Sequence, residues 1–359
     1  MATGELTARI VGSGSFLPPN RLDNFELYER ESIQRNFDVE KARGSLRNGS
    51  GSDDLSAAEV FDLWSRQVTG IRERRIVDED GEVTTESMCA EAARRALEMA
   101  GMDSRDLDLI VVASLTASEE VPNVACTVGS LIGAPAVGGY VLNAACAGFI
   151  YAMATGFSFI KSGLGRRILV VSGDALSHIV DYSDPKTAVL FGDGAGAVVL
   201  QATEDGEGVL GRPYLTADYS HEHMNLTGQW WITEESEATH LRMGGGAHVL
   251  RQAVNTMTGV ASRALETTGL TWDDIDFVIP HQANLRITQG IEKALRLSKG
   301  RVIHTIEEYG NMSASTVPIA LDEVMRGRHG PVSDPARFVL TAVGGGYTSG
   351  AIVFEWSGA

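Results

Sequence analysis

Several features that mark particular protein classes are scarce in this sequence. There are 3 cysteines among 359 residues, too few for a disulfide framework and not at a metal-ligand spacing. Asp and Glu (47) outnumber Lys and Arg (30), and the net charge of -17 argues against general binding of nucleic acid. No apolar run approaches the roughly 18 residues of a membrane span, and the N-terminus lacks a signal-peptide pattern. We therefore expect a cytoplasmic protein with no nucleic-acid or membrane partner.

Motifs for metals and cofactors are equally incomplete. His221 and His223 have no third ligand at a usual spacing, so no metal site is predicted. Residues 12–15, at the end of an expected first strand, are a partial dinucleotide fingerprint that no helix pattern follows. Cys89 and Cys126 lie in helix-like patterns and are expected to be buried and unreactive.

The third cysteine lies in the most informative stretch, residues 141–150. An apolar run gives way to small residues around Cys146, and apolar residues then recur at Ile150, Met153 and Phe157. This pattern predicts a strand, a tight turn and a helix that begins at the cysteine. A thiol at a helix N-terminus meets unpaired N–H groups and the positive end of the dipole, both of which favour the reactive thiolate. A buried structural cysteine fits the stretch equally well, so it leaves both interpretations open.

An internal repeat predicts the architecture. Residues 92–101 resemble residues 260–269, and the strand-like runs that follow them match at the same offset, about half the chain. Two copies of one helix-turn-strand unit predict an α/β fold of two similar halves, with sheets covered by helices on both faces. We place the halves at residues 1–205 and 206–359.

The first half carries a charged segment. Residues 20–58 are polar, and we expect a mobile insertion at about residues 27–55 with one short helix around residues 24–35. The arginines of residues 64–75 form either a solvated face or an entrance for an anionic substrate.

Two polar residues of the second half are candidates for a catalytic site. His281 follows an expected strand, and Asn311 precedes an expected helix. A strand over residues 276–279 runs into Pro280 and His281, which places His281 at a carboxyl end, where open α/β sheets bind their ligands. Asn311 lies on a loop before another helix. A lone histidine is more often structural, but Cys146, His281 and Asn311 at comparable turns point to one catalytic site.

Longer motifs around these residues resemble those of the thiolase superfamily, and within it β-ketoacyl-acyl-carrier-protein synthase III (KAS III). The resemblance covers nearly the whole chain outside the insertion. Its motifs agree in order and spacing, and they lie at residues 69–74, 143–148, 191–196, 281–286, 310–311 and 344–350. It implies a thiolase-like fold layered α-β-α-β-α, a homodimer, and acyl carrier protein as a partner.

The resemblance also implies a reaction. Cys146 takes an acyl group from a thioester, and a malonyl group on acyl carrier protein then loses CO2 and attacks it. Backbone N–H groups of Cys146 and Gly345 stabilise the oxyanion, and His281 and Asn311 polarise the malonyl carbonyl. No cofactor is implied beyond the coenzyme A or phosphopantetheine of the substrates.

The chain lacks the catalytic residues that other members of the thiolase superfamily use for related reactions. Thiolases carry a second cysteine near the last glycine turn, where this chain has Ala342 and Val343. Type I and II ketosynthases resemble a Cys-His-His set, whereas position 311 is Asn, and the final turn of plant chalcone synthases is absent. KAS III-like condensation remains.

The chain departs from the family at the expected coenzyme A contacts. Trp64 is kept, but Val68 and Pro185 stand where the family has arginines, with Lys186 beside Pro185. The family's pantetheine-contacting Asn is lost near Gly245. We therefore expect a carrier-bound acyl donor to fit better than an acyl-coenzyme A.

Residues around the expected tunnel suggest its size and its docking contacts. Val121 and Val343 replace family Phe residues, which predicts an acyl chain longer than acetyl; Val121 is also expected at the dimer interface. Glu120 lies one position from a base used by head-to-head condensing enzymes. Arg286 and Arg251 match carrier-contacting positions, unless each merely caps a helix or pairs with an acid.

Three functions remain after the sequence analysis. The leading one is a specialised KAS III-like ketosynthase of a secondary pathway, which joins an activated acyl group to a malonyl or β-ketoacyl carrier thioester. The others are the general initiator of fatty-acid synthesis, using acyl-coenzyme A, and an acyltransferase that forms an ester or amide from the Cys146 acyl group. Asn311 favours condensation, because simple acyl transfer needs no pair of enolate-stabilising donors.

Overall fold

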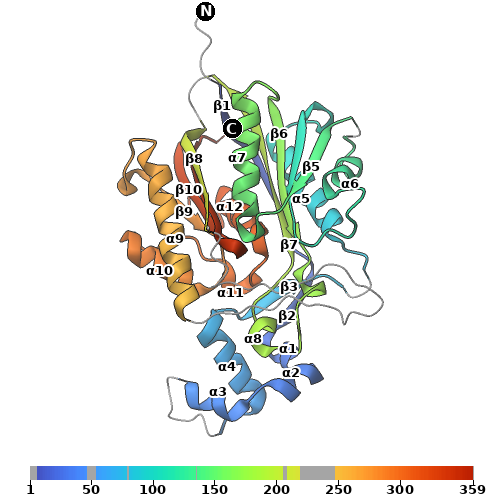
Figure 1. The fold of residues 1–359 in the computed structure, drawn as a ribbon, viewed down its shortest axis with the longest axis vertical. Coiled ribbons are helices and arrows are strands. Elements are labelled where there is room, and N and C mark those ends of the chain that lie inside the picture. The colour runs from blue at the N-terminus through green and yellow to red at the C-terminus, as the bar shows by residue number, and fades with distance from the viewer. Residues whose placement is uncertain are drawn as a thin grey trace, which may run out of the picture.

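The computed structural model describes residues 6–46, 54–78, 81–134, 136–204, 208–218 and 247–358. Two mixed sheets dominate it (Figure 1). The first has the order β1 (Thr7–Phe16), β7 (Gly194–Thr203), β6 (Arg167–Asp174), β4 (Leu109–Ala113) and β5 (Gly138–Leu142). The second has the order β8 (Val209–Ala217), β11 (Thr348–Trp356), β10 (Ala336–Val343) and β9 (Phe277–Pro280).

The two sheets repeat one plan. Each begins with an antiparallel trio, β1, β7 and β6 in the first and β8, β11 and β10 in the second. A parallel strand follows in each, β4 beside β6 and β9 beside β10. In the first sheet β5 pairs with β4 in parallel. At the corresponding edge of the second sheet, an isolated parallel bridge joins Val278 of β9 to Val302. The predicted α/β fold with an internal duplication is confirmed.

Helices form three layers around these sheets (Figure 1). Between the sheets lie α7 (Gly148–Lys161) and α12 (Thr316–Met325), whose apolar residues share one core with strands of both sheets. The first sheet is covered on its outer face by α5 (Thr85–Ala100) and α6 (Val124–Leu131). The second is covered by α9 (Ala247–Glu266), against which α10 (Leu285–Leu295) packs. The predicted α-β-α-β-α layering is confirmed.

The central position of α7 and α12 follows from their composition. Every residue of α12 is buried, as expected for a helix without a polar stripe. Gly156 lets α7 approach the first sheet closely, since a Cβ there would lie 2.9 Å from a methyl carbon of Leu200. None of the described helices is both long and apolar enough to cross a membrane.

A small helical lobe lies at one end of the molecule, at the bottom of Figure 1. It consists of β2 (Asn20–Asp23), α1 (Asn24–Tyr28), α2 (Glu31–Asn36), α3 (Val39–Ser45), α4 (Ala57–Thr69), β3 (Glu73–Ile76) and α8 (Pro185–Ala188). The helix expected around residues 24–35 is present as α1 and α2, and α3 is a further helix that the sequence analysis did not predict. Asp23 caps α1 and Asp38 caps α3, and sparse apolar residues such as Leu27 and Ile33 give the lobe its own core.

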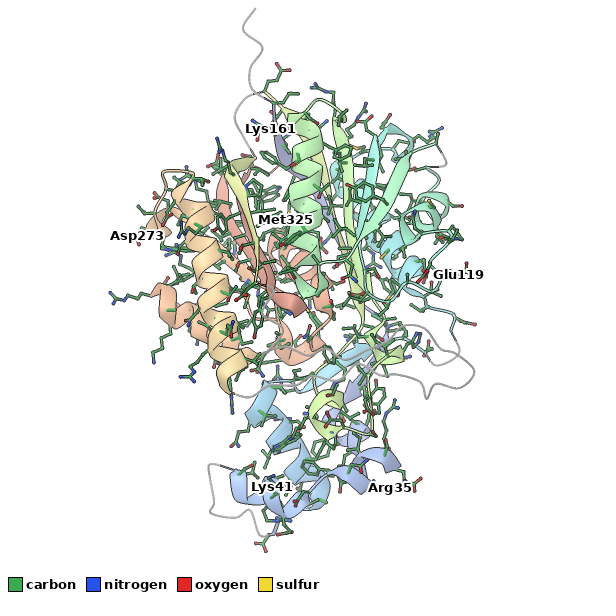
Figure 2. All side chains as sticks on the ribbon, in the orientation of Figure 1. Arg35, Lys41, Glu119, Lys161, Asp273 and Met325 are labelled. Carbon is green, nitrogen blue, oxygen red and sulfur yellow. The ribbon has the colours of Figure 1, made fainter. Side chains whose placement is uncertain are left out.

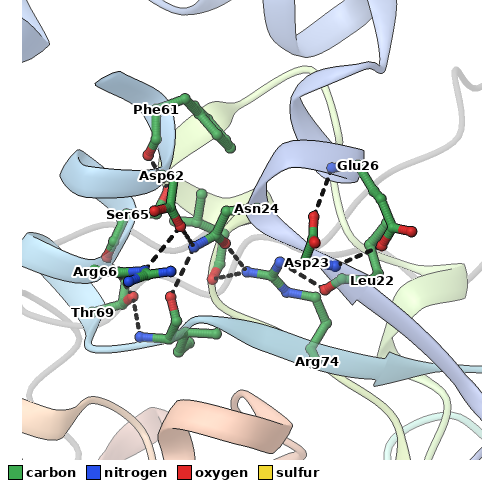
Figure 3. A network of polar contacts seen from close by, with 12 residues as sticks. Leu22, Asp23, Asn24, Glu26, Phe61, Asp62, Ser65, Arg66, Thr69 and Arg74 are labelled. Atoms are coloured by element: carbon green, nitrogen blue, oxygen red, sulfur yellow. Dashed lines mark hydrogen bonds and ion pairs between the residues drawn. The ribbon is translucent and has the colours of Figure 1, made fainter. Parts of the chain in front are cut away.

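A buried arginine ties separate segments of the lobe together (Figure 3). The Arg74 guanidinium donates to the Leu22 carbonyl at 3.1 Å, and to Asn24 Oδ1 and the Val189 carbonyl at 3.0 Å each. Asn24 Nδ2 in turn donates to Asp62 Oδ1 at 2.9 Å. Burial lowers the pKa of Arg74 to about 10, so the side chain stays charged at neutral pH.

The other arginines of this stretch are also engaged. Arg66 lies 3.0 Å from Asp62, Arg72 lies 3.7 Å from Glu308, and Arg75 donates to the Pro18 carbonyl at 3.1 Å. Arg74 therefore serves the structure, and the interpretation of residues 64–75 as a row of anion-binding arginines is wrong for it.

Arg74→Met is expected to lower the free energy of unfolding by at least about 3 kcal/mol, because three buried acceptors lose their donor at about 1–3 kcal/mol each. Urea unfolding followed by tryptophan fluorescence measures the loss. Arg72→Met is the control, since its ion pair is half exposed and is worth about 0–1 kcal/mol. Equal small losses for both variants would contradict the structural role of Arg74.

Candidate active site

Three tight turns meet at the junction of the two sheets. The 3₁₀ turn η3 (Ala145–Ala147) carries Cys146 between β5 and α7, as the sequence predicted. It contacts η6 (Ser313–Ser315), which lies between α11 (Ile306–Tyr309) and α12. It also contacts η7 (Gly345–Tyr347), between β10 and β11. Segments from both halves of the chain thus converge on the cysteine.

Each turn holds one residue other than glycine in a left-handed backbone conformation. The φ angles are 48° at Ala145, 51° at Ser313 and 46° at Tyr347. Among the described residues other than glycine, only Arg296 shares this conformation, and it ends α10, where such angles are common. Left-handed conformations cost free energy in residues with a Cβ, and they concentrate at functional sites. The geometry of the three turns is therefore imposed by the surrounding fold.

Cys146 is partly exposed and lies one turn before the first residue of α7. The Ser313 hydroxyl donates to its Sγ at 3.8 Å. Desolvation nevertheless raises the pKa of Cys146 to about 11. The dipole of α7 acts in the opposite direction and favours the thiolate. Burial outweighs the Ser313 contact, so the side chain rests as a thiol at neutral pH and must lose its proton when it reacts.

His281 follows β9 directly, at the predicted carboxyl end of the strand. Its Nδ1 lies 2.7 Å from the Thr316 hydroxyl, and Thr316 Oγ1 also lies 3.1 Å from the Ser313 carbonyl oxygen. Burial lowers the pKa of His281 to about 3, so the ring is neutral at working pH. The contact between Nδ1 and Thr316 fixes the orientation of the ring.

Asn311 is held in one orientation by its own backbone. Its N–H donates to the Leu190 carbonyl at 2.8 Å, and its carbonyl accepts from Gly192 N–H at 3.1 Å. The side-chain Oδ1 accepts from Ser313 N–H at 2.9 Å. Because Oδ1 is occupied, Nδ2 is the end of the amide that is left to donate to another group.

The last glycine turn lies against the backbone of the cysteine. A Cβ at Gly344 would be 2.9 Å from the Cys146 nitrogen and 2.8 Å from the Ala144 carbonyl oxygen. Thr348 fixes this approach by donating to the same Ala144 carbonyl at 2.7 Å. The N–H groups of Cys146 and of the neighbouring Gly345 therefore belong to adjacent stretches of backbone.

Beneath the cysteine lies a carboxyl group that the sequence analysis missed. Asp174, the last residue of β6, is fully buried, and its Oδ1 accepts from Leu115 N–H at 2.6 Å and from two hydroxyls. Oδ2 has no hydrogen-bond partner among the described residues. Burial raises the pKa of Asp174 to about 7, although Leu115 N–H and the nearby hydroxyls, that of Ser313 among them, act to lower it.

The residues expected to form the tunnel are dispersed. Trp64 packs against Phe37 in the lobe, with ring centroids 5.1 Å apart. Val343 is buried beside Gly344, whereas Val121 is 86% exposed. Gly245 lies outside the described residues, as do His221 and His223.

The predicted docking residues are both exposed. Arg286 begins α10 and donates to the Gln67 carbonyl at the end of α4, beside an Asn284 contact to the Val68 carbonyl at 2.9 Å. The sequence analysis left open whether Arg286 contacts the carrier or only caps a helix. Its contact with Gln67 is of the second kind, because it caps α4. Arg251 is exposed on α9.

The other two cysteines differ in their exposure to solvent. Cys89 is buried in α5, as predicted, and burial raises its pKa. Cys126 is exposed, so the prediction that it is buried is wrong. It lies on the outward side of α6, whose Val124, Ala125 and Val128 face the core instead.

Comparison with known proteins agrees with this geometry. Residues 140–216 match the family described as 3-oxoacyl-[acyl-carrier-protein (ACP)] synthase III, and residues 265–356 match the C-terminal part of that synthase. A β-ketoacyl-[acyl-carrier-protein] synthase III 1 of Bacillus cereus is 40% identical over 347 residues, 97% of this chain and 98% of the relative. The chain belongs to the KAS III family.

Solved structures of KAS III enzymes share the fold. The 3-oxoacyl-[acyl-carrier-protein] synthase III of Aquifex aeolicus gives a TM-score of 0.81 at 35% identity, covering 97% of this chain and 100% of its own. The priming β-ketosynthase of the R1128 polyketide pathway gives 0.84 at 28% identity, covering 100% and 98%. The thiolase-like fold is confirmed, and the chain is a KAS III condensing enzyme, an acyltransferase.

Proposed function

We propose that this KAS III enzyme primes fatty-acid synthesis: it takes an acyl group from acyl-coenzyme A and condenses it with malonyl-acyl carrier protein. The observation that carries the proposal is the convergence of Cys146, His281 and Asn311 through η3, η6 and β9. The relatives at 35% identity or more are named simply as synthase III, while the polyketide-priming relative shares 28%. A specialised role, which the sequence analysis favoured, therefore has less support.

Cys146 performs the first step of the proposed reaction. Its Sγ attacks the carbonyl carbon of the acyl thioester, and the thiol of the donor leaves. The oxyanion that forms in between accepts hydrogen bonds from the N–H groups of Cys146 and Gly345. One such donor typically contributes about a hundred- to thousand-fold in rate.

His281 and Asn311 serve the second step. When the malonyl group loses CO2, its thioester carbonyl becomes an enolate, and Nε2–H of His281 and Nδ2 of Asn311 donate to the enolate oxygen. The carbanion carbon then attacks the Cys146 thioester, which releases the β-ketoacyl carrier product. Because burial holds the pKa of His281 at about 3, the ring keeps its neutral donor form at any working pH.

A cavity in the lobe supports coenzyme A as the acyl carrier of the donor. It has a volume of about 590 Å³, and its lining includes Trp64, Pro185, Lys186 and Lys41. Lys186 follows Pro185, which stands at one of the family's arginine positions, and Lys41 comes from α3. The lining also includes Asp38 and Asp184, whose carboxylates cap α3 and α8. We propose that the Trp64 indole contacts the adenine and that the lysines contact the phosphates.

Lys186→Glu is expected to raise the KM for an acyl-coenzyme A about tenfold or more, because charged hydrogen bonds to phosphate are worth about 1.5–3 kcal/mol. Acylation by a truncated thioester that lacks the nucleotide should not change. Lys161→Glu is the control, since Figure 2 shows Lys161 at the opposite end of the molecule from Lys41. A KM that rises equally for both thioesters would contradict the assignment.

Carrier docking is proposed at Arg251 and Arg286, which are exposed cations on neighbouring helices. Arg286→Glu is expected to raise the KM for malonyl-acyl carrier protein about tenfold, while hydrolysis of a small thioester stays unchanged. Since Arg286 also caps α4, Arg251→Glu separates docking from lobe stability. Equal losses with both substrates would count against docking.

A homodimer is proposed from the edge of the first sheet. β5 is the last strand of that sheet among the described residues and presents an unpaired edge, and the apolar Val121 is 86% exposed. Val121 would then border the acyl pocket of the partner subunit. Sedimentation of wild type and Val121→Asp at matched concentrations tests this arrangement, and a monomeric wild type would contradict it.

Intact-protein mass spectrometry tests the function itself. The enzyme is incubated with acyl-coenzyme A and with acyl carrier thioesters, and Cys146→Ala is the control. An adduct that requires Cys146 and is discharged by malonyl carrier, with loss of CO2, is the expected result. An adduct that passes only to alcohols or amines would support the ester- or amide-forming alternative. Absence of any adduct would return Cys146 to a structural role.

A further inference from the structure

The buried carboxyl of Asp174 has no part in the reaction described so far. It lies at the carboxyl end of the central strand β6, which contacts η6. Its Oδ1 is saturated by Leu115 N–H and the hydroxyls of Ser114 and Thr116, whereas Oδ2 has no hydrogen-bond partner among the described residues. A fully buried carboxylate oxygen without a donor is costly, and such a group calls for a functional explanation.

Ser313 lies between this carboxyl and the nucleophile. Its hydroxyl donates to Cys146 Sγ at 3.8 Å, and it is also close enough to Asp174 to lower the pKa of that carboxyl. The left-handed φ of 51° and a 1% exposed side chain hold the hydroxyl in this place. A hydroxyl can turn so that it accepts from one neighbour and donates to the other, so Ser313 can pass a proton from Cys146 to Asp174 once its hydrogen turns away from Sγ.

We propose that Asp174 accepts the thiol proton of Cys146 through the Ser313 hydroxyl during acyl transfer. The inference rests on the proposed role of Cys146 as the nucleophile. As Sγ bonds to the acyl carbon, its proton moves to Ser313 Oγ, and the Ser313 proton moves to Asp174 Oδ2. When the tetrahedral intermediate expels the donor thiolate, the proton returns along the same path to that sulfur. The net change is exchange of the acyl group between two thiols.

The electrostatics of the site fit a shared proton. Desolvation raises the pKa of both groups, to about 11 for Cys146 and about 7 for Asp174. The charge of Asp174 itself contributes to the raised pKa of Cys146, so a thiolate is disfavoured while the carboxylate remains ionised. Cys89 on α5 is the other titratable group that senses Asp174, and it stays neutral because its pKa is raised too.

The pH dependence of acylation distinguishes this role from a structural one. Rates of Cys146 acylation by acyl-coenzyme A are measured by quenched-flow mass spectrometry from about pH 5 to about pH 9. In wild type the rate should rise with an inflection near pH 7, because Asp174 accepts a proton only when it is ionised. In Asp174→Asn the inflection should vanish, and the rate at neutral pH should fall about a hundredfold or more.

Ser313→Gly provides a second variant if Asp174→Asn does not fold. Glycine adopts the left-handed backbone of this position without cost, so the turn is kept while the hydroxyl is lost. The same loss of rate and inflection is expected. Ser172→Ala is the matched control, since it removes a buried hydroxyl that bonds Ser315 at 2.9 Å and touches neither Cys146 nor Asp174.

Each other outcome overturns the inference. An inflection near pH 7 that persists in Asp174→Asn would show that another group takes the proton. Faster acylation in this variant would show that the carboxylate only repels the thiolate. If wild type forms no adduct at all, the proposed function fails instead, and the two failures are therefore distinguishable.

Discussion

Asn311→Asp is expected to lower the rate of condensation by at least about a hundredfold, while acylation of Cys146 stays within about tenfold of wild type. The carboxylate keeps the contact from Ser313 N–H to Oδ1, which is 2.9 Å long in the wild type. Its other oxygen replaces the Nδ2 donor. A negative charge then faces the carbonyl that becomes an enolate, so a stabilising contact turns into a repulsive one.

The two half reactions are measured separately to check this prediction. Cys146 is first acylated, excess donor is removed, and product and CO2 are followed after addition of malonyl carrier. Asn284→Asp is the matched control, because it makes the same substitution at a buried asparagine whose Nδ2 donates to the Val68 carbonyl at the end of α4. Equal losses in both half reactions of Asn311→Asp would indicate that Asn311 supports Cys146 rather than the malonyl carbonyl.

The pH profiles of the half reactions should also differ. His281 has a pKa of about 3 through burial, so its neutral form is lost only as the pH falls through that value. Protonation of His281 therefore removes no condensation activity in the neutral range. Asp174 titrates near pH 7, and acylation alone is expected to inflect there.

The parts of this enzyme that sequence reasoning could predict are local. Cys146 stands between a short apolar run and a helical repeat, and these two periodicities suffice to predict β5, the turn and α7. The duplicated helix-turn-strand unit likewise predicts α5 with β4 and α9 with β9. The position of His281 could be predicted because the strand pattern of residues 276–279 ends just before Pro280 and His281.

The contributions of Asp174, Thr316 and Ser313 to the site could not be predicted from local sequence patterns. Asp174 is the last residue of an apolar strand, and only the fold brings it near η6, which is more than a hundred residues away in the sequence. Thr316 orients His281 across a separation of 35 residues. Such contacts depend on tertiary packing, which leaves no periodic signal in one chain.

In the lobe the sequence does carry a pattern for helices, but it is weak, and the prediction missed part of it. Leu27, Ile33 and Phe37 are few among charged neighbours, so the segment resembled a loop. They nevertheless bury themselves against Phe61 of α4. The consequence for function is that Lys41 and Trp64 line the same cavity, and the expected loss of the coenzyme A clamp has to be judged against this positive charge.

Gly344→Ala is expected to lower the rates of both half reactions by at least about a hundredfold, because small misplacements of reacting groups have effects of this size. The new Cβ would lie 2.8 Å from the Ala144 carbonyl oxygen and 2.9 Å from the Cys146 nitrogen. Real Cβ atoms do not approach backbone so closely, so η3 and η7 must separate. The N–H groups of Cys146 and Gly345 then no longer point at one oxyanion.

Gly44→Ala in α3 is the control for this substitution, since a Cβ there meets no atom within 4 Å. It should leave both rates unchanged and stabilise the helix by about 0.5–1 kcal/mol. Quenched-flow acylation and malonyl-dependent discharge of the acyl-enzyme measure the two steps. If Gly344→Ala spares acylation, the oxyanion is held elsewhere and Gly345 is wrongly assigned. Loss of both rates with a native melting temperature would instead locate the damage at the contact between η3 and η7.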